Sequence, residues 1–371
     1  MMEYTELKIR LMQQGAVFTR EARANMNHTR FGHIVYEDYA TTGGVVVKMD
    51  NRIYANVPVK YENTPFLVDF KDQKFRLEMN GRMLNSLVEI MPAPGFALNN
   101  ALLPDGTPVR ELVMVHADRM RISPIHGCDY HCQFCTCNHQ RYLEIPCGTL
   151  EQAVQTALSD NSVSPRHILI SGGTPKQEEG TYQYLNEVYR YFPKKYSDYD
   201  FDVMLSPRGL HVRDAGKEGY TDFLKYLYED CGIKTLSVNL ELYQDELRRR
   251  YILDKYKIGK DNYYLFIQKA VDIFGQGNVR SSLIAGLETI EDTLQGVQAL
   301  CSLGCIPVLS AFVPGDGTDL QQHPKPDSEF LLQLVLAADD IARQHGMELG
   351  PVCRPCTHNS ITKETGNASW M

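Results

Sequence analysis

The chain is 371 residues long, 43% of its residues are hydrophobic and 23% are charged, and its formal net charge at pH 7 is -8. This composition is ordinary for a globular protein with a sizeable core, and the negative charge argues against nucleic acid as a main partner. No apolar run reaches membrane-spanning length and the first residues do not form a signal peptide. We therefore expect a cytoplasmic protein with no membrane partner.

The first 115 residues predict a small accessory domain that is mostly β. An amphipathic helix lies near the start, where Leu7, Leu11 and Met12 alternate with charged residues. Short strands follow between about Gly32 and Ile90, and prolines and glycines mark an irregular linker up to about residue 115. We find no catalytic constellation here, so structural support is the leading interpretation, with substrate capping and partner binding still open.

Residues 116–346 alternate strand and helix six times. We expect the strands at Met120–Ser123, His167–Ile170, Phe201–Leu205, Thr235–Leu240, Val279–Ile284 and Ile306–Val313. Thr149 and Thr289 each open a capping box at the start of a helix. Regular βα alternation predicts parallel strands joined by right-handed crossovers, and six units predict an α/β fold of the partial (β/α)6 TIM barrel type. Chemistry is then expected at the carboxyl ends of the strands.

Residues 347–371 form a C-terminal extension with a C-x2-C pair, Cys353 and Cys356. This pair is either part of a second metal site, with zinc or an auxiliary cluster, or two reduced thiols. For a metal site, the further ligands would be His358 or Cys137.

Three cysteines follow the first barrel strand with the spacing C-x3-C-x2-C: Cys128, Cys132 and Cys135. The chain has ten cysteines and none precedes Cys128, a clustering that favours metal ligation over disulfides. Three thiolates hold three corners of an iron–sulfur cube and leave the fourth iron open to a small molecule. A structural zinc site would need a fourth ligand, and free thiols are the third alternative. The available zinc ligands nearby are His126, His131, Cys137 and His139.

Polar motifs also end the second and fourth barrel strands. Gly172 and Gly173, followed by Thr174, allow a backbone to approach a ligand closely. Asn239 and Glu241 alternate with apolar residues, so both are expected to face the barrel interior. A buried carboxylate is costly unless it is paired, which indicates a polar or cationic ligand.

Substrate contacts are expected at the inner face and mouth of the barrel. Arg280 is predicted to point inward from the fifth strand, and an inward arginine needs an anionic partner such as a substrate carboxylate or phosphate. Arg208, His211 and Tyr243 follow strands three and four at the predicted mouth. Arg280, Arg208 and Tyr243 are therefore the catalytic candidates. The run of three arginines at residues 248–250 is interpreted as a solvated helix face.

The cysteine loop, with Phe134 directly before its last cysteine, resembles the cluster loop of the radical S-adenosylmethionine (radical SAM) superfamily. The pattern of the later motifs is nearest the biotin synthase and lipoyl synthase-like branch. The resemblance implies a [4Fe-4S] cluster on Cys128, Cys132 and Cys135, whose open iron is chelated by the amino and carboxylate groups of S-adenosylmethionine. Lipoyl synthase activity itself is not expected, because the chain has no additional cysteine set before Cys128.

The same resemblance implies roles for the other motif positions. Gly172, Gly173 and Thr174 would meet the amino group of S-adenosylmethionine, although many relatives have an acidic residue at the position of Thr174. The ribose and amino acid portions would contact Asn239 and Glu241, and the carboxylate would contact a basic residue, Lys260. The adenine pocket would be formed by Phe134, Ile284 and Val313.

The activity implied is reductive cleavage of S-adenosylmethionine to methionine and a 5′-deoxyadenosyl radical, which abstracts hydrogen from a small molecule or cofactor precursor. An electron donor such as flavodoxin or ferredoxin would be the protein partner. Two alternatives stay open. One is a radical SAM enzyme that modifies a peptide or protein recognised by residues 1–115. The other is a non-catalytic scaffold that binds zinc or an iron–sulfur cluster.

Overall fold

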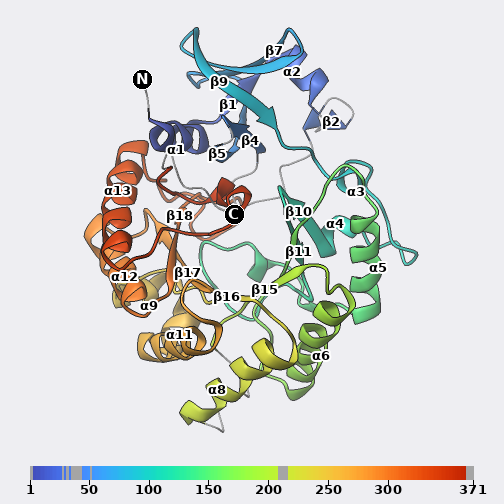
Figure 1. The fold of residues 1–371 in the computed structure, drawn as a ribbon, viewed down its shortest axis with the longest axis vertical. Helices are drawn as coiled ribbons and strands as arrows, with labels where there is room; N and C mark the ends of the chain where they lie inside the picture. The colour runs from blue at the N-terminus through green and yellow to red at the C-terminus, as the bar shows by residue number, and fades with distance from the viewer. Residues whose placement is uncertain are drawn as a thin grey trace.

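Two seven-stranded sheets organise the protein, as a computed structural model shows (Figure 1). The structure describes residues 3–26, 29–30, 33–34, 44–50, 52–207 and 216–364. The first sheet has the strand order β5-β4-β9-β8-β7-β1-β6, and the second has the order β10-β11-β14-β15-β16-β17-β18.

The N-terminal sheet and its helices occupy the part of the chain before residue 91. The elements are α1 (Tyr4–Gln14), β1 (Ala16–Phe18), α2 (Arg20–Asn25), β4 (Val45–Met49), β5 (Ile53–Val57), β6 (Val59–Lys60), β7 (Phe66–Lys71), β8 (Lys74–Met79) and β9 (Arg82–Ile90), with a separate pair β2 (Thr29–Arg30) and β3 (His33–Ile34). Leu7 and Leu11 of α1 share a buried core with Val45 and Val47 of β4. Pairing is antiparallel except at β1, which runs parallel to β6 and β7.

The second sheet curls into a half-barrel. Its strands are β10 (Val113–His116), β11 (Arg119–Ile122), β14 (His167–Ile170), β15 (Asp200–Met204), β16 (Thr235–Ser237), β17 (Val279–Ala285) and β18 (Ile306–Ala311). From β11 to β18 every neighbouring pair is parallel, and each strand begins within one residue of its predicted start. Sequence reasoning missed β10, which pairs antiparallel with β11 and lies in a stretch that was predicted to be linker. A four-residue strand directly before another strand carries little periodic signal.

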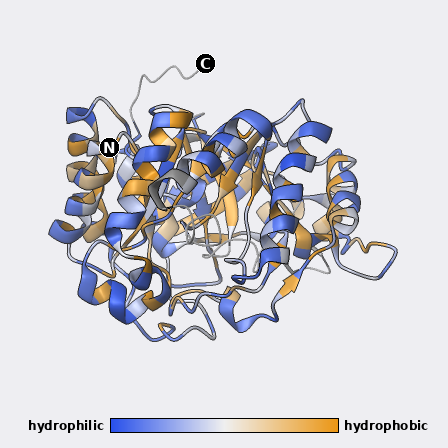
Figure 2. Cartoon of the chain, turned by 90° about the horizontal axis from the view of Figure 1, so that it is seen from below, coloured by the Kyte–Doolittle hydropathy of each residue, from blue (hydrophilic) through white to orange (hydrophobic). Residues whose placement is uncertain are grey.

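Helices surround this sheet and cover its outer face. The main ones are α5 (Cys147–Leu158), α6 (Glu179–Lys195), α8 (Gly216–Lys225), α9 (Asp245–Tyr251), α10 (Leu253–Ile258), α11 (Lys260–Phe274), α12 (Ile290–Ser302) and α13 (Ser328–Gln344). Figure 2 shows the apolar strands at the centre and polar residues on the outer faces of the helices. None of the helices in the described ranges is long and apolar enough to cross a membrane.

The two predicted helix starts have different outcomes. Thr289 caps α12 as predicted, and its Oγ1 accepts the Asp292 backbone N–H at 3.1 Å. The prediction for Thr149 is wrong, because α5 begins two residues earlier, after Pro146. A proline fits the position before a helix because its fixed φ and missing N–H cost nothing there.

The C-terminal segment bridges the two edge strands of the half-barrel. Ile361 N–H donates to the Leu309 carbonyl of β18 at 2.8 Å, and the ring of His358 stacks on His116 of β10 with centroids 5.2 Å apart. His358 lies in the short helix η3 (Pro355–Asn359), which packs against β5 of the N-terminal sheet. Figure 1 shows this segment between β10 and β18, with the N-terminal sheet beyond it.

A buried lysine joins α1 to the same segment. The Nζ atom of Lys8 donates to Thr362 Oγ1 at 2.8 Å and pairs with Glu364 at 3.1 Å, and the Lys8 side chain is fully buried. The N-terminal sheet is therefore packed onto the barrel through residues 355–364. The exact domain boundaries, after residues 115 and 346, stay predictions.

Candidate active site

A cavity of about 240 Å³ lies at the carboxyl ends of the parallel strands. The loops after β11, β14, β15 and β16 surround it, which is where barrels of this kind carry their sites. The predicted residues that line it are Cys128, Cys132, Phe134, Cys135, Gly172, Gly173, Thr174, Asn239 and Glu241. An apolar part of the wall comes from helices α6, α8 and α11, through Tyr182, Leu185, Tyr189, Phe223 and Phe266. The cysteine motif and both strand-end motifs therefore meet at one cavity.

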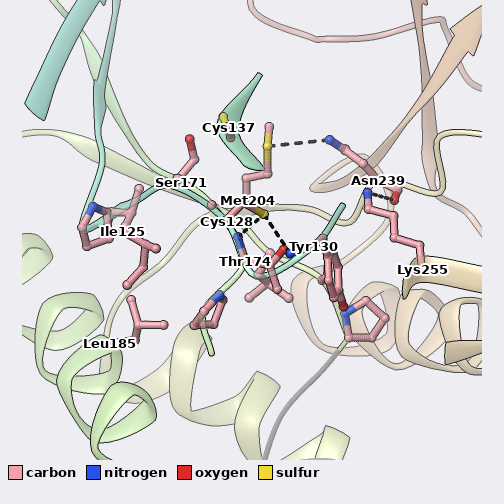
Figure 3. Close-up of a pocket in the computed structure, with 18 of the residues that line it drawn as sticks. Ile125, Cys128, Tyr130, Cys137, Ser171, Thr174, Leu185, Met204, Asn239 and Lys255 are labelled. Atoms are coloured by element: carbon pink, nitrogen blue, oxygen red, sulfur yellow. Dashed lines mark hydrogen bonds between the residues drawn. The ribbon is translucent and has the colours of Figure 1, made fainter. Parts of the chain in front are cut away.

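The cysteine loop is held from two sides. Thr174 N–H donates to Cys128 Sγ at 3.1 Å and Tyr130 N–H donates to the same sulfur at 3.4 Å (Figure 3). On the other side, Gln133 N–H donates to the Tyr251 carbonyl at 2.9 Å. Backbone amides directed at a cysteine sulfur are typical of cluster ligands, whose charge they stabilise.

The two glycines after β14 let the cysteine loop lie directly on that strand end. A Cβ atom on Gly172 would lie 2.6 Å from the Ile125 carbonyl oxygen, and one on Gly173 would lie 1.6 Å from the Gly127 carbonyl oxygen. Both separations are far below van der Waals contact, so any side chain here would push the loop away. The glycines were predicted to let a backbone approach a ligand. The structure shows them in close contact with the backbone of the cysteine loop.

Glu241 sits in a tight, left-handed turn after β16. Its φ is 68°, a conformation that costs a non-glycine residue free energy unless neighbours fix it. Arg248 holds this turn in place, because its guanidinium donates to the carbonyls of the two flanking residues, Leu240 at 3.0 Å and Leu242 at 2.9 Å. Glu288 accepts the next N–H group, from Tyr243, at 2.8 Å. A buried arginine and a buried carboxylate thus hold the loop that presents Glu241.

Arg248 corrects one sequence interpretation. The sequence predicts a solvated helix face for the three arginines 248–250, and Arg249 and Arg250 are indeed exposed. Arg248 is 0% exposed and points under the loop. Three like residues in a row on a helix point in different directions, so one of them can be buried.

A polar cluster of Asn239, Glu241 and Lys255 forms the wall opposite the cysteine loop. Lys255 Nζ donates to the Glu241 carboxylate at 2.9 Å and to the Asn239 carbonyl at 3.0 Å. The Asn239 side chain accepts Ser237 Oγ–H at 2.9 Å and donates to Met204 Sδ at 3.6 Å (Figure 3). Burial lowers the pKa of Lys255, but the Glu241 carboxylate beside it more than offsets this and raises the pKa overall. The lysine is therefore charged at neutral pH.

Burial and hydrogen bonding shift the pKa values of Cys132, Cys135 and the neighbouring Cys137. Burial raises the pKa of Cys132 to about 12. The hydrogen bond between Cys135 and Cys137, with burial adding to it, raises the pKa of Cys135. The same hydrogen bond lowers the pKa of Cys137 to about 7, against the effect of burial. Cysteines bind metal as thiolates, so occupation of this loop releases protons.

The donor set of the loop fits an iron–sulfur cluster better than a single ion. A zinc ion draws its four ligand atoms close together. Among the described residues, the group whose ligand atoms all lie within 4.8 Å of one another contains none of Cys128, Cys132 and Cys135. These three cysteines line the cavity, and three thiolates around an open space are what a cube with three protein corners needs.

Several predicted residues do not line the cavity. Ile284 is buried beneath the cysteine loop, in a cluster with Tyr130 and Cys132, and Val313 is likewise absent from the lining. Lys260 donates to the Tyr243 carbonyl at 3.0 Å, pairs with Asp245 at 3.3 Å and covers the Tyr243 ring at 4.4 Å. Lys260 and Tyr243 thus contact each other outside the cavity.

Arg280 is at the far end of its strand. It is the second residue of β17, and its guanidinium pairs with the Asp202 carboxylate at 3.2 Å and donates to Thr235 Oγ1 at 3.1 Å. The anionic partner that an inward arginine needs is therefore a protein residue, and the basis for an anionic substrate is removed. Arg208 and His211 lie outside the described residues.

Lys255 is the site residue that sequence reasoning missed. It lies four residues after Tyr251 and three before Ile258, so it occupies the apolar face of the segment that forms α9 and α10. A lysine at a position whose helical neighbours are apolar was the available signal for a buried cation.

Comparisons with known proteins find solved structures of low sequence identity. No protein-family model matches the sequence, and no curated protein sequence matches it. Among solved structures, methylornithine synthase (PylB) is 12% identical with a TM-score of 0.49, over 63% of this chain and 64% of that chain. A radical SAM methyltransferase from Sphaerobacter thermophilus is 13% identical with a TM-score of 0.46, over 79% of this chain and 77% of that chain.

HydG, a maturase of the [FeFe]-hydrogenase, is 14% identical with a TM-score of 0.46, over 65% of this chain and 53% of that chain. The chain thus spans less than two thirds of the length of methylornithine synthase and of HydG. With TM-scores below 0.5, these similarities assign no function to the chain.

Proposed function

We propose that the protein is a radical SAM enzyme that acts on a small molecule. The observation that carries this proposal is the meeting of the three-cysteine loop with the strand-end motifs at Gly172–Thr174 and Asn239–Glu241 around one cavity. Cys128, Cys132 and Cys135 would hold a [4Fe-4S] cluster, and the polar cluster opposite would hold S-adenosylmethionine. When bound, the pair would supply one-electron cleavage to a 5′-deoxyadenosyl radical that removes hydrogen from the substrate.

The protein's own part in this activity is binding and exclusion of water. In this proposal Lys255, rather than Lys260, would contact the carboxylate of S-adenosylmethionine. In support, Lys255 lines the cavity and its ammonium is held by Glu241. Thr174 donates its backbone N–H to Cys128 Sγ, and its carbonyl accepts the Asp129 N–H at 3.0 Å. Its hydroxyl is therefore the group left for the cofactor in place of an acidic side chain. The aromatic and aliphatic side chains of α6, α8 and α11 would cover an apolar part of the substrate.

A peptide substrate recognised by residues 1–115 has less support. All the residues that line the cavity within the described ranges lie at or after Pro124. The described N-terminal sheet packs instead on η3 and, through α1, on α13. We therefore assign this sheet a supporting role, with a flavodoxin or ferredoxin as the proposed source of electrons.

Anaerobic reconstitution of the protein with iron and sulfide tests the proposal. The reconstituted protein is expected to absorb in the visible and to form 5′-deoxyadenosine from S-adenosylmethionine when a reductant is added. Cys132→Ala is expected to lose both properties, because two thiolates cannot retain the cube. Cys137→Ala is the matched control and is expected to keep its cluster iron. A well-folded protein with neither cluster nor deoxyadenosine would contradict the proposal.

The two lysines near the site provide a second test. Lys255→Met is expected to weaken S-adenosylmethionine binding at least roughly tenfold, because it removes a buried cation and leaves Glu241 to repel the cofactor carboxylate. Lys260→Met is the matched control, because it removes a nearby lysine whose contacts lie outside the cavity. This variant is expected to bind S-adenosylmethionine as the unsubstituted protein does. Equilibrium dialysis on the reconstituted proteins measures both. If Lys260→Met weakened S-adenosylmethionine binding more than Lys255→Met did, Lys260 would be the cofactor ligand and the assignment of Lys255 would be wrong.

A further inference from the structure

Four metal-ligating side chains converge at the end of the barrel opposite the cavity. Asp118 directly precedes β11, His167 is the first residue of β14, and Cys353 and Cys356 come from the C-terminal segment. Their ligand atoms all lie within 4.8 Å of one another. Because each strand begins at this end, the group lies on the floor of the half-barrel, away from Cys128, Cys132 and Cys135.

The separations between these atoms are those of a tetrahedral coordination shell. The Sγ of Cys356 lies 3.2 Å from His167 Nε2 and 3.8 Å from Asp118 Oδ1. The Sγ of Cys353 lies 3.2 Å from Asp118 Oδ1, which is 3.8 Å from His167 Nε2. Zinc bonds of 2.0–2.3 Å to oxygen, nitrogen and sulfur imply tetrahedral edges of roughly 3.3–3.8 Å.

The contact made by the second ring nitrogen of His167 is independent evidence for a metal site. His167 Nδ1 lies 3.4 Å from an Asp202 carboxylate oxygen, and Asp202 is itself paired with Arg280. A histidine that binds metal through one ring nitrogen nearly always donates its other N–H to a carboxylate or carbonyl, which fixes the tautomer and aims the free nitrogen at the metal. The arrangement here directs Nε2 of His167 at the two cysteines. It also gives Arg280 a role, which is to hold Asp202 in place.

We propose that Asp118, His167, Cys353 and Cys356 bind one Zn²⁺ ion in a closed, structural site. Two thiolates, one imidazole and one carboxylate form a ligand set that suits zinc, and four protein ligands leave no position for a substrate. Cys356 is only 2% exposed, which also excludes it as an accessible nucleophile. The net charge of such a site is -1, and Arg166, whose Nε lies 3.6 Å from Asp118, balances it.

The proposed ligand set differs from the one expected from the sequence. His358 is turned away, since its Nδ1 lies 2.8 Å from the Pro355 carbonyl and its ring stacks on His116. Cys137 lines the cavity at the opposite end of the barrel. The site would fasten η3, and with it the N-terminal strand β5 that packs on η3, to the barrel floor.

The test begins with the full chain carrying Cys128→Ser, Cys132→Ser and Cys135→Ser together, which removes the other cysteine loop. This protein is expected to be purified with about one zinc per chain by elemental analysis. Replacement of the zinc by Co²⁺ is expected to give thiolate-to-cobalt charge-transfer bands and the intense visible bands of tetrahedral cobalt. Absence of metal, iron in place of zinc, or an octahedral cobalt spectrum would each overturn the proposal.

Single substitutions in the same background identify the ligands. Cys356→Ser and His167→Gln are each expected to lower the zinc content or affinity at least roughly tenfold. Cys301→Ser, at a buried thiol of α12, is the matched control and is expected to keep its zinc. If the ligand variants do not fold, removal of zinc from the folded parent with a chelator is expected to lower its melting temperature and zinc return to restore it. An unchanged melting temperature would overturn the structural role.

This outcome is independent of the proposed function. Zinc content is measured in a chain that cannot hold the [4Fe-4S] cluster, and no deoxyadenosine assay enters the result. Rapid alkylation of Cys356 in the zinc-loaded chain would show an accessible thiol and would also contradict a closed site.

Discussion

Substitution of Gly173 by alanine is expected to impair assembly of the cluster severely. The added Cβ would lie 1.6 Å from the Gly127 carbonyl oxygen and 2.7 Å from the Cys128 Cα, so the cysteine loop must move. The movement breaks the hydrogen bond from Thr174 N–H to Cys128 Sγ and displaces one of three ligands. Iron and sulfide content after reconstitution, and deoxyadenosine formation with it, are expected to fall at least roughly tenfold.

Gly180 provides the matched control for that variant. It lies in the first turn of α6, and a Cβ there would meet nothing within 4 Å. Gly180→Ala is expected to assemble the cluster normally and to gain about 0.5–1 kcal/mol of stability, because alanine loses less backbone freedom in a helix. If Gly173→Ala assembled as much cluster as Gly180→Ala, the close packing of the loop on the β14 end would not be required for it.

Arg248→Met is expected to cause the largest loss of stability among single substitutions at the site. The side chain is 0% exposed and makes hydrogen bonds to the carbonyls of Leu240, Leu242 and Lys255. Hydrogen bonds from a charged group contribute about 1.5–3 kcal/mol each, so the free energy of unfolding should fall by at least about 3 kcal/mol. Urea denaturation measures the loss.

The same variant should also impair the cofactor pocket. Without Arg248, the left-handed turn that presents Glu241 loses its support, so binding of S-adenosylmethionine by the reconstituted variant is expected to weaken at least roughly tenfold. Arg249→Met, at the exposed neighbour, is expected to change the free energy of unfolding by less than about 0.5 kcal/mol. Equal effects of the two substitutions would contradict the structural role of Arg248.

The parallel strands, and the grouping of the strand-end motifs around one cavity, could be predicted from the sequence. Strong period-two and apolar runs placed all six parallel strands, because buried parallel strands are apolar along their length. The cysteines and the strand-end residues 172–174, 239 and 241 could be grouped, because the ends of successive parallel strands meet at one edge. Local spacing and the expected topology were therefore sufficient to group those residues at one edge of the sheet.

Residues whose partners are distant in the chain could not be placed. Arg280 was expected to face a substrate, but its register on β17 puts it at the strand start, beside Asp202. The start of β17 was predicted correctly, but the Asp202 partner of Arg280 lies 78 residues away in the chain and could not be identified from local spacing. The grouping of Asp118 and His167 with Cys353 and Cys356 could not be predicted for the same reason, because 235 residues separate Asp118 from Cys353.

The buried lysine of α1 has a consequence for how the protein is made. Lys8 is separated from Thr362 by 354 residues, yet its fully buried ammonium finds its hydrogen-bond partners in the segment that contains Thr362. During synthesis the ribosome releases α1 long before residues 355–364 exist. At that stage the Lys8 ammonium lacks its partners and the edges of β10 and β18 are unbridged. The first helix can pack on β4 and β5 as soon as they emerge, and the half-barrel can collapse strand by strand. The Lys8 contact with residues 362–364 must wait for one of the last segments, which makes this contact a late step of folding.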